Sequence, residues 1–258
     1  MPMAAAQLFD LAGRVALVTG ASSGLGARFA TVLAEQGAAV VLVARREDRL
    51  AGEAARIKES GGRALAVAAD VRDRAAMARA FEAAEAAFGT VDILVNNAGV
   101  AHADRVTELA EEEWRRVIGT NLDAVLFSSQ EAARRLIAAG KGGAIVNIAS
   151  VLGFGVAKGV AAYAVAKAGV VHLTKALGLE LAGKGIRVNA IAPGWIVTDL
   201  NRDYLASEKG AAVREHIPLG RFGEERDLDG ALLLLASDAG RFMTGTTVVV
   251  DGGQMVTV

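Results

Sequence analysis

The feature that most constrains the fold of this chain is a repeated alternation between short, continuously apolar runs and longer amphipathic stretches. The apolar runs are rich in Val, Ile, Leu and Ala, as expected of strands that are buried on both faces of a sheet. Each run is separated from the next by enough chain for a crossover helix. The alternation therefore predicts an α/β fold with one doubly wound, seven-stranded parallel sheet flanked by helices.

The expected elements cover almost the whole chain. Strands are expected at residues 14–19, 39–44, 63–68, 91–95, 144–148, 186–191 and 246–250, and helices at 27–36, 47–60, 73–88, 161–181 and 224–236. A longer helix is expected from a cap at Thr107 to Ala139. No linker and no internal repeat divides the chain, so we expect a single domain over residues 1–258. Residues 199–221 lack a regular pattern, and we interpret them as a mobile substrate flap.

Composition and charge argue against several classes of function. With 28 basic and 29 acidic side chains the net charge is −1, which gives no broad attraction to nucleic acid or to an anionic membrane. The chain has no cysteine, so it forms no disulfide and has no thiol nucleophile. Its histidines lack metal-ligand spacing, and we expect no catalytic metal. We also expect a cytoplasmic protein without a signal peptide or a membrane-spanning segment.

A glycine-rich turn joins the first expected strand to the first expected helix. Its glycines, Gly20, Gly24 and Gly26, have the spacing G-x-x-x-G-x-G. Glycine allows close approach of the backbone to a ligand, and a helix N-terminus offers free N–H groups and a positive dipole to phosphate. Such turns also occur as plain packing, but the position between strand and helix favours dinucleotide binding.

The second expected strand ends at Ala44-Arg45-Arg46. A unit that binds NAD usually has an acidic residue here for the ribose 2′-hydroxyl, whereas an arginine suits a 2′-phosphate. We therefore expect NADP, with NAD as the less favoured cofactor. The alternative is that both arginines only begin a solvated helix.

A tyrosine, a lysine and a serine are candidates for acid–base chemistry. Tyr163 and Lys167 lie four residues apart on an expected helix, so the phenol and the ammonium share one face. A fixed positive charge favours phenolate, and we expect Lys167 to lower the pKa of Tyr163. Ser150 follows a strand and faces the crevice in which parallel sheets bind ligands. We expect the three side chains to meet at one carbonyl; the alternative for the pair is a helix surface contact.

Asparagines stand at two further positions of interest. Asn96-Asn97-Ala98-Gly99 follows the fourth expected strand, where the amides suit backbone contacts across strands, a ligand edge, or a simple turn. Asn121 lies inside the longest expected helix. Asparagine lowers helix propensity there, so Asn121 is either tolerated on a polar face or has a task.

In combination these motifs resemble the short-chain dehydrogenase/reductase family from residue 14 to residue 253, and in particular its 3-oxoacyl-[acyl-carrier-protein] reductase-like members. The resemblance rests on Thr19-Gly20-x-x-x-Gly24-x-Gly26, Asp70, Asn96-Asn97-Ala98-Gly99, Asn121, Ser150, Tyr163-x-x-x-Lys167 and Pro193-Gly194, in that order and at family spacing. Each motif is modest alone, and their combination is specific. The resemblance implies a Rossmann fold.

The resemblance also implies catalytic roles for four residues. Tyr163 is similar to the acid/base that exchanges a proton with the substrate oxygen. Lys167 is similar to the lysine that lowers the tyrosine pKa and binds the nicotinamide ribose. Ser150 resembles the serine that polarises the substrate oxygen, and Asn121 the residue that holds a water in the proton relay.

A cofactor site is implied in the same way. The turn at residues 20–26 would hold the pyrophosphate, Asp70 and Val71 resemble adenine contacts, and Asn97 and Gly99 would border the adenosine half. The implied set is Gly20, Ser22, Ser23, Gly24, Leu25, Gly26, Arg45, Asp70, Val71, Asn97, Gly99, Tyr163, Lys167, Pro193, Gly194, Ile196 and Thr198.

Two parts of this set concern the ends of the cofactor. Ile196 and Thr198 resemble the pair that orients the nicotinamide carboxamide. Arg45 matches the reader of the 2′-phosphate in NADP-dependent members, whereas Ser23 stands where some of those members have a second basic residue.

The implied activity is NADP-dependent reduction of a ketone or a 3-oxoacyl substrate. The alternatives are an NAD-dependent alcohol, hydroxy-acid or sugar dehydrogenase and a non-catalytic dinucleotide-binding regulator, against which the presence of Ser150, Tyr163 and Lys167 argues. The partner would be a small carbonyl or alcohol compound, in a pocket expected at Leu152, Phe154, Val156, Trp195 and Tyr204. The family also suggests a homotetramer, with which Ala132-Ala133, Ala161-Ala162, Val256 and Val258 are compatible.

Overall fold

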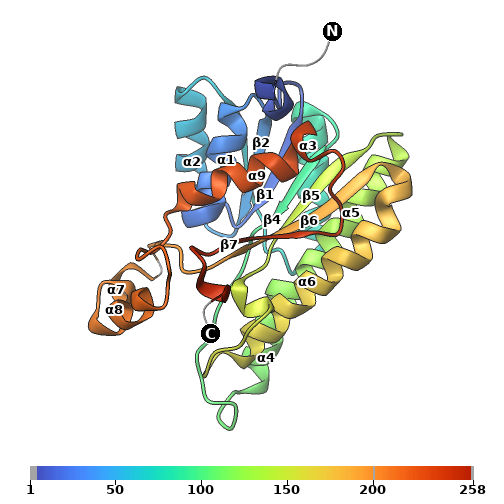
Figure 1. Ribbon diagram of the computed structural model, residues 1–258. Helices are drawn as coiled ribbons and strands as arrows, with labels where there is room; N and C mark the ends of the chain where they lie inside the picture. The colour runs from blue at the N-terminus through green and yellow to red at the C-terminus, as the bar shows by residue number, and fades with distance from the viewer. Residues whose placement is uncertain (1–4, 200, 257–258) are drawn as a thin grey trace.

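The computed structural model describes residues 5–199 and 201–256. Its centre is a seven-stranded sheet with the strand order β3-β2-β1-β4-β5-β6-β7, in which every neighbouring pair is parallel (Figure 1). The strands are β1 (Val15–Thr19), β2 (Ala39–Ala44), β3 (Arg63–Ala68), β4 (Ile93–Asn96), β5 (Gly143–Ile148), β6 (Ile186–Pro193) and β7 (Thr247–Val250). The predicted α/β fold with a doubly wound, seven-stranded parallel sheet is confirmed.

Helices cover both faces of the sheet (Figure 1). They are α1 (Gly24–Glu35), α2 (Glu47–Glu59), α3 (Arg74–Phe88), α4 (Glu111–Ile118), α5 (Ala124–Ala138), α6 (Ala161–Leu181), α7 (Arg202–Leu205), α8 (Glu208–Glu215) and α9 (Asp229–Ala236). Successive strand residues point to opposite faces, so Val18 belongs to a core with α1, α2 and α9, and Leu17 to a core with α3, α5 and α6. Each face therefore has its own apolar core. No helix of the described residues is long and apolar enough to cross a membrane.

The helix expected from Thr107 to Ala139 is wrong in two respects. Its first part, α4, begins only at Glu111, and its N-cap is Ala110, so Thr107 lies in a preceding turn. Three glutamates fill the first turn of α4, where acidic side chains complement the helix dipole. The chain then stays helical to Ala138, as expected, but passes through a π-helical turn, Gly119–Asp123, which joins α4 to α5 and contains Asn121.

Two further expectations about local structure need correction. The segment 199–221 is not irregular throughout, because it contains α7 and α8; Ser207 caps α8 by accepting a hydrogen bond from the Gly210 N–H. The helix expected at 224–236 begins as a 3-10 turn, Glu225–Leu228, and becomes α-helical only at Asp229.

The strand order brings four candidate segments to one edge of the sheet. Gly20 follows β1, Asn97 follows β4, Ser150 lies just beyond β5, and Pro193 ends β6. These four strands are consecutive neighbours and parallel, so their carboxyl ends lie side by side. A crevice at such an edge is the usual ligand site of an open parallel sheet.

Candidate active site

The glycine turn after β1 is packed too tightly for any side chain at two of its positions. Gly20 has a φ of 69°, and a Cβ on it would lie 2.8 Å from the Ala98 Cα. A Cβ on Gly26 would lie 2.3 Å from the Gly20 carbonyl oxygen and 2.5 Å from the Asn97 Nδ2. Asn97 stabilises the same turn by donating from Nδ2 to the Thr19 carbonyl oxygen at 2.9 Å. The turn is thus held between the ends of β1 and β4.

The start of α1 is suited to an anionic ligand. Its N-cap, Ser23, makes no side-chain capping hydrogen bond, so this side chain leaves the first-turn N–H groups available to a ligand. Gly24 has a φ of 56°, and a Cβ there would meet nothing closer than 3.8 Å. An open helix N-terminus behind a tight glycine turn fits the pyrophosphate of a dinucleotide.

Arg46, which sequence reasoning did not select, contacts this turn. It donates from Nη2 to the Ser22 Oγ at 2.9 Å and to the Ser23 Oγ at 2.7 Å. Arg45, the predicted phosphate reader, is exposed at the end of β2. The structure therefore places a second cation beside the predicted one, and the Arg45-Arg46 pair in the sequence was the available signal.

Asp70 and Val71, the predicted adenine contacts, follow β3. Arg72 forms a two-pronged ion pair with Asp70, with an Nη2–Oδ2 distance of 2.7 Å. This hydrogen bonding is the main cause of the lowered pKa of Asp70, and the charge of Arg45 contributes a smaller part. Val71 is buried, so mainly its backbone is available to a ligand.

The two asparagines after β4 have separate environments. Asn96 is buried and donates from Nδ2 to the Ser129 Oγ at 3.0 Å and to the Asn147 Oδ1 at 2.9 Å, which links β4 to α5 and β5. Asn97 contacts the end of β1. The Asn96 side chain therefore supports the sheet, whereas Asn97 borders the crevice.

Asn121 is completely buried in the π-helical turn between α4 and α5. Its side chain accepts from the Val100 N–H and donates to the Val100 carbonyl oxygen, both at 2.8 Å. Gly99 lies next to it, since a Cβ on Gly99 would be 3.5 Å from the Asn121 Oδ1. Asn121 thus has a task inside the helix: it holds the segment after β4.

Tyr163 and Lys167 lie on α6, and Ser150 lies just beyond β5. Tyr163 hydrogen-bonds the Ser150 hydroxyl, and the Lys167 Nζ is 5.6 Å from the centre of the Tyr163 ring. The Lys167 Nζ also donates to the Ile148 carbonyl oxygen at 2.6 Å. The structure therefore brings the three predicted side chains together.

The titration of this group differs from the prediction. Burial raises the pKa of Tyr163, and the hydrogen bond from Ser150 only partly opposes this, so the expected lowering of the tyrosine pKa is wrong for this structure. The Lys167 ammonium is almost completely buried, and desolvation lowers its pKa to about 8. Desolvation is thus the largest cause of the pKa shift in both groups, and the Lys167 ammonium is hydrogen-bonded to the Ile148 carbonyl oxygen of β5.

The segment after β6 adds a contact that the sequence did not suggest. Thr198 donates from its backbone N–H to the Asn201 Oδ1 at 2.8 Å, and Asn201 donates from Nδ2 to the Ile196 carbonyl oxygen at 2.9 Å. Ile196 itself is buried. A Cβ on Gly194 would lie 2.8 Å from the Asp251 Cα, so glycine is needed there.

The residues expected around the substrate divide into two groups. Trp195 and Tyr204 stack with ring centroids 5.9 Å apart, which joins the end of β6 to α7. Phe154 and Val156 are exposed, with 47% and 87% of their surfaces accessible, and Leu152 is half-buried. The stacked pair therefore has a defined contact, whereas Phe154 and Val156 are exposed to solvent.

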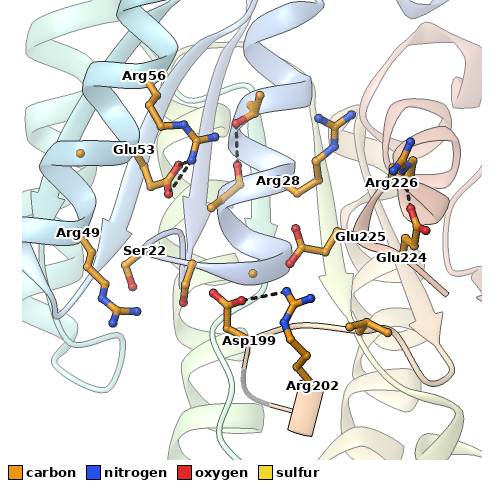
Figure 2. Close-up of a pocket in the computed structure, with 16 residues that line it drawn as sticks. Ser22, Arg28, Arg49, Glu53, Arg56, Asp199, Arg202, Glu224, Glu225 and Arg226 are labelled. Carbon is orange, nitrogen blue, oxygen red and sulfur yellow. Dashed lines mark hydrogen bonds and ion pairs between the residues drawn. The ribbon is translucent and has the colours of Figure 1, made fainter. Parts of the chain in front are cut away.

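A cavity of about 1130 Å³ flanks the glycine turn on the side of α1 and α2 rather than at Tyr163 (Figure 2). Charged side chains dominate its lining: Arg28, Arg49, Glu53, Arg56, Asp199, Arg202, Glu224, Glu225 and Arg226. Ser22, Ser23 and Gly24 belong to the same lining, so the cavity opens beside the start of α1. Among residues 5–199 and 201–256 no group of three or more His, Asp or Glu side chains is arranged to hold a metal ion.

Comparison with known proteins gives close likenesses over nearly the full chain. Residues 20–255 match the protein family described as "Enoyl-(Acyl carrier protein) reductase". The chain is 40% identical to 2-dehydro-3-deoxy-D-gluconate 5-dehydrogenase of Dickeya dadantii, covering 96% of this chain and 97% of the relative. It is 39% identical to 3-oxoacyl-[acyl-carrier-protein] reductase FabG of Staphylococcus aureus, covering 93% and 97%.

A solved structure is equally similar. The crystal structure of a gluconate 5-dehydrogenase from Burkholderia cenocepacia, in complex with NADP and tartrate, superposes with a TM-score of 0.94 at 38% identity. The superposition covers 99% of this chain and 100% of that protein.

Proposed function

This chain belongs to the short-chain dehydrogenase/reductase family, and we propose that it is an NADP-dependent oxidoreductase that interconverts a carbonyl compound and a secondary alcohol. The observation that carries the proposal is the contact of Tyr163 with Ser150, with Lys167 directly beside the phenol ring. This cluster lies at the same edge of the sheet as the open start of α1. A regulator without chemistry would need only the glycine turn.

The proton chemistry follows from the positions of these side chains. When bound, the nicotinamide dinucleotide supplies or accepts the hydride. Tyr163 gives a proton to the carbonyl oxygen during reduction and takes one from the alcohol during oxidation. The Ser150 hydroxyl donates to the same oxygen, where a fixed donor is most effective as negative charge develops. Lys167, protonated below its pKa of about 8, holds a positive charge beside the Tyr163 ring, and its hydrogen bond to the Ile148 carbonyl oxygen fixes that position.

We assign Asn121 a positioning role in this scheme. Both polar atoms of its side-chain amide are used by Val100. Each of these atoms makes one hydrogen bond to Val100, so the amide holds the segment after β4, and the backbone of the π-helical turn is a further group to which a relay water could bind.

The preference for NADP rests on two arginines. Arg45 directly follows β2, and Arg46 donates to the Ser22 and Ser23 hydroxyls, so one cation contacts the glycine turn and the other is its neighbour in the chain. Guanidinium groups suit a 2′-phosphate. NADP in the Burkholderia cenocepacia structure is consistent with this choice. The rival is an NAD-dependent alcohol, hydroxy-acid or sugar dehydrogenase.

Two classes of substrate are favoured. Reduction of a ketone or 3-oxoacyl compound agrees with the name of the Staphylococcus aureus relative, and oxidation of a sugar acid agrees with that of the Dickeya dadantii relative. The apolar Trp195–Tyr204 border favours a substrate with an apolar part, and we therefore rank the 3-oxoacyl or ketone substrate first.

Fluorescence titration with NADPH and NADH tests the cofactor assignment. We expect NADPH to bind more tightly than NADH. We also expect Arg46→Ala and Arg45→Ala each to lower the affinity for NADPH by about tenfold and to leave the affinity for NADH nearly unchanged. An equal effect on both cofactors would identify the arginines as surface charges. The better cofactor is then used to assay ketones, 3-oxoacyl thioesters and sugar acids.

We further propose that the protein is a cytoplasmic homotetramer. Exposed apolar side chains such as Val165 and Leu179 on α6 and Val256 near the C-terminus support an interface there. Ala132, Ala133 and Ala162 do not, because they are buried within this chain. Val258 lies outside the described residues. Light scattering of the purified protein measures the mass of the assembly.

A further inference from the structure

Glu225 has an acidic side chain that lies beside the start of α1, the helix that would bind the cofactor phosphates. It begins the 3-10 turn before α9 and is half-buried. Its Oε1 lies 3.8 Å from the position that a Cβ would take on Gly24, the first residue of α1. Figure 2 shows the carboxylate lying between Arg28 and the Asp199–Arg202 pair, beside the start of α1.

The cations near Glu225 are already committed to other carboxylates. Arg28 donates from Nε to both carboxylate oxygens of Asp229, each at 3.1 Å. Arg202 pairs with Asp199 at 3.2 Å. Within the described part of the chain, no hydrogen bond or ion pair neutralises Glu225, so its charge is only partly compensated.

The titration of Glu225 is consistent with this environment. Burial is the largest cause of its raised pKa, and the charge of Asp199 adds to it; Glu53 contributes in the same direction. Arg202 and Arg28 act against the shift without cancelling it. A further negative charge at the start of α1 would therefore meet a carboxylate that is already poorly stabilised.

We propose that Glu225 weakens dinucleotide binding by repelling the cofactor pyrophosphate at the start of α1. The inference rests on the proposed function, since it assumes that the glycine turn holds a dinucleotide. The N-terminus of α1 attracts negative charge, and the Glu225 carboxylate reduces the positive potential that the phosphates would meet there. The pyrophosphate is common to NAD and NADP, so Glu225 acts on both cofactors equally, whereas Arg45 and Arg46 distinguish them. Glu225 thereby speeds release of the spent cofactor.

The test compares Glu225→Gln with Glu224→Gln in titrations with NADPH and NADH at low ionic strength. Glu224 is a matched control because it lines the same cavity but is exposed and paired with Arg226 at 2.7 Å. We expect Glu225→Gln to raise the affinity for both cofactors by the same factor, about threefold or more, and Glu224→Gln to leave both affinities unchanged. The gain should shrink in 0.5 M salt because salt screens the repulsion.

A second variant separates charge from packing. Glu225→Asp keeps the negative charge, so we expect its affinities to stay within about twofold of the unmodified protein. If Glu225→Gln binds no tighter, or tightens NADPH alone, the inference is overturned while the proposed function stands. If the unmodified protein binds neither cofactor, the proposed function and the inference are both overturned. Stopped-flow displacement should show the gain of Glu225→Gln in a slower dissociation rate.

Discussion

At the scale of single residues, the site depends on a phenol that shares a hydrogen bond with Ser150 and lies next to an almost completely buried ammonium. Tyr163 has its pKa raised by burial, and Lys167 has its pKa lowered by the same cause. Each shift favours the neutral form of its group. Lys167 therefore titrates nearer to neutral pH than a free lysine, whereas Tyr163 holds its proton more tightly than a free tyrosine.

Replacing Tyr163 with phenylalanine removes the hydroxyl and keeps the ring. We expect turnover to fall by about 10²-fold to 10⁴-fold, because a positioned acid/base contributes that much, with cofactor affinity nearly unchanged. Steady-state rates and cofactor titrations measure the two effects. Tyr204→Phe is the control, since its ring can still stack on Trp195. Turnover of Tyr163→Phe within tenfold of the unmodified enzyme would refute the assigned role.

How far the site could be predicted depends on whether a contact follows from local spacing. Tyr163 and Lys167 follow from helix periodicity, and Ser150 from its position at a strand end. Arg46 was missed because the choice between adjacent arginines depends on how α2 begins, and Arg46 is the N-cap of that helix. Asn201 was missed because its partners, Ile196 and Thr198, are fixed by the path of an irregular segment.

At the scale of elements, strands were easier to predict than helix interruptions. The bounds of β2 and β3 match the expected ranges; β2 is a continuous apolar run, and β3 is apolar after Arg63. The π-helical turn was not predicted because local sequence does not indicate it; in the structure it coincides with a tertiary contact, in which the buried Asn121 amide binds the Val100 backbone. The short helices α7 and α8 lack the apolar periodicity that identifies longer helices.

Gly26→Ala tests the tight contact between the glycine turn and α1. The new Cβ would lie 2.3 Å from the Gly20 carbonyl oxygen, so the turn must open. We expect the free energy of unfolding to fall by about 1–3 kcal/mol and cofactor binding to be lost. Denaturant unfolding and cofactor titration measure both.

Gly52→Ala is the matched control for this substitution. Gly52 lies inside α2, and a Cβ there meets nothing within 4 Å. Alanine has the higher helix propensity, so we expect stabilisation of about 0.5–1 kcal/mol and unchanged cofactor binding. Equal behaviour of the two variants would show that the turn tolerates a side chain.

At the scale of the whole molecule, the buried Lys167 couples stability to pH. The pKa of Lys167 is about 8 in the folded chain, and its ordinary value, which applies to the unfolded chain, is 10.5. Between these pH values the unfolded chain therefore binds more protons than the folded chain. The free energy of unfolding therefore rises with pH in this window, by at most about 1.4 kcal/mol per pH unit from this group. Below pH 8 the cost of burying the charge is present in full.

Urea unfolding of the unmodified protein and of Lys167→Met between pH 8 and pH 10.5 measures this linkage. Between pH 8 and pH 10.5 we expect the free energy of unfolding of the unmodified protein to rise more than that of the variant. The difference between the two rises should be about 1–3 kcal/mol. The other titrating groups are common to both proteins and cancel in the difference. Parallel profiles would mean that the lysine pKa is not lowered.

The interior position of β1 in the sheet has a consequence for how the chain is made. β1 pairs with β2 on one side and with β4 on the other (Figure 1). During synthesis β2 follows soon after, but roughly 70 residues separate the end of β1 from the start of β4, which takes a ribosome about 4–15 s. For that interval β1 has an open, apolar edge on the side where β4 will pair, which is the kind of edge that recruits other chains. The strand that later supports the glycine turn is therefore the one that a chaperone would need to shield first.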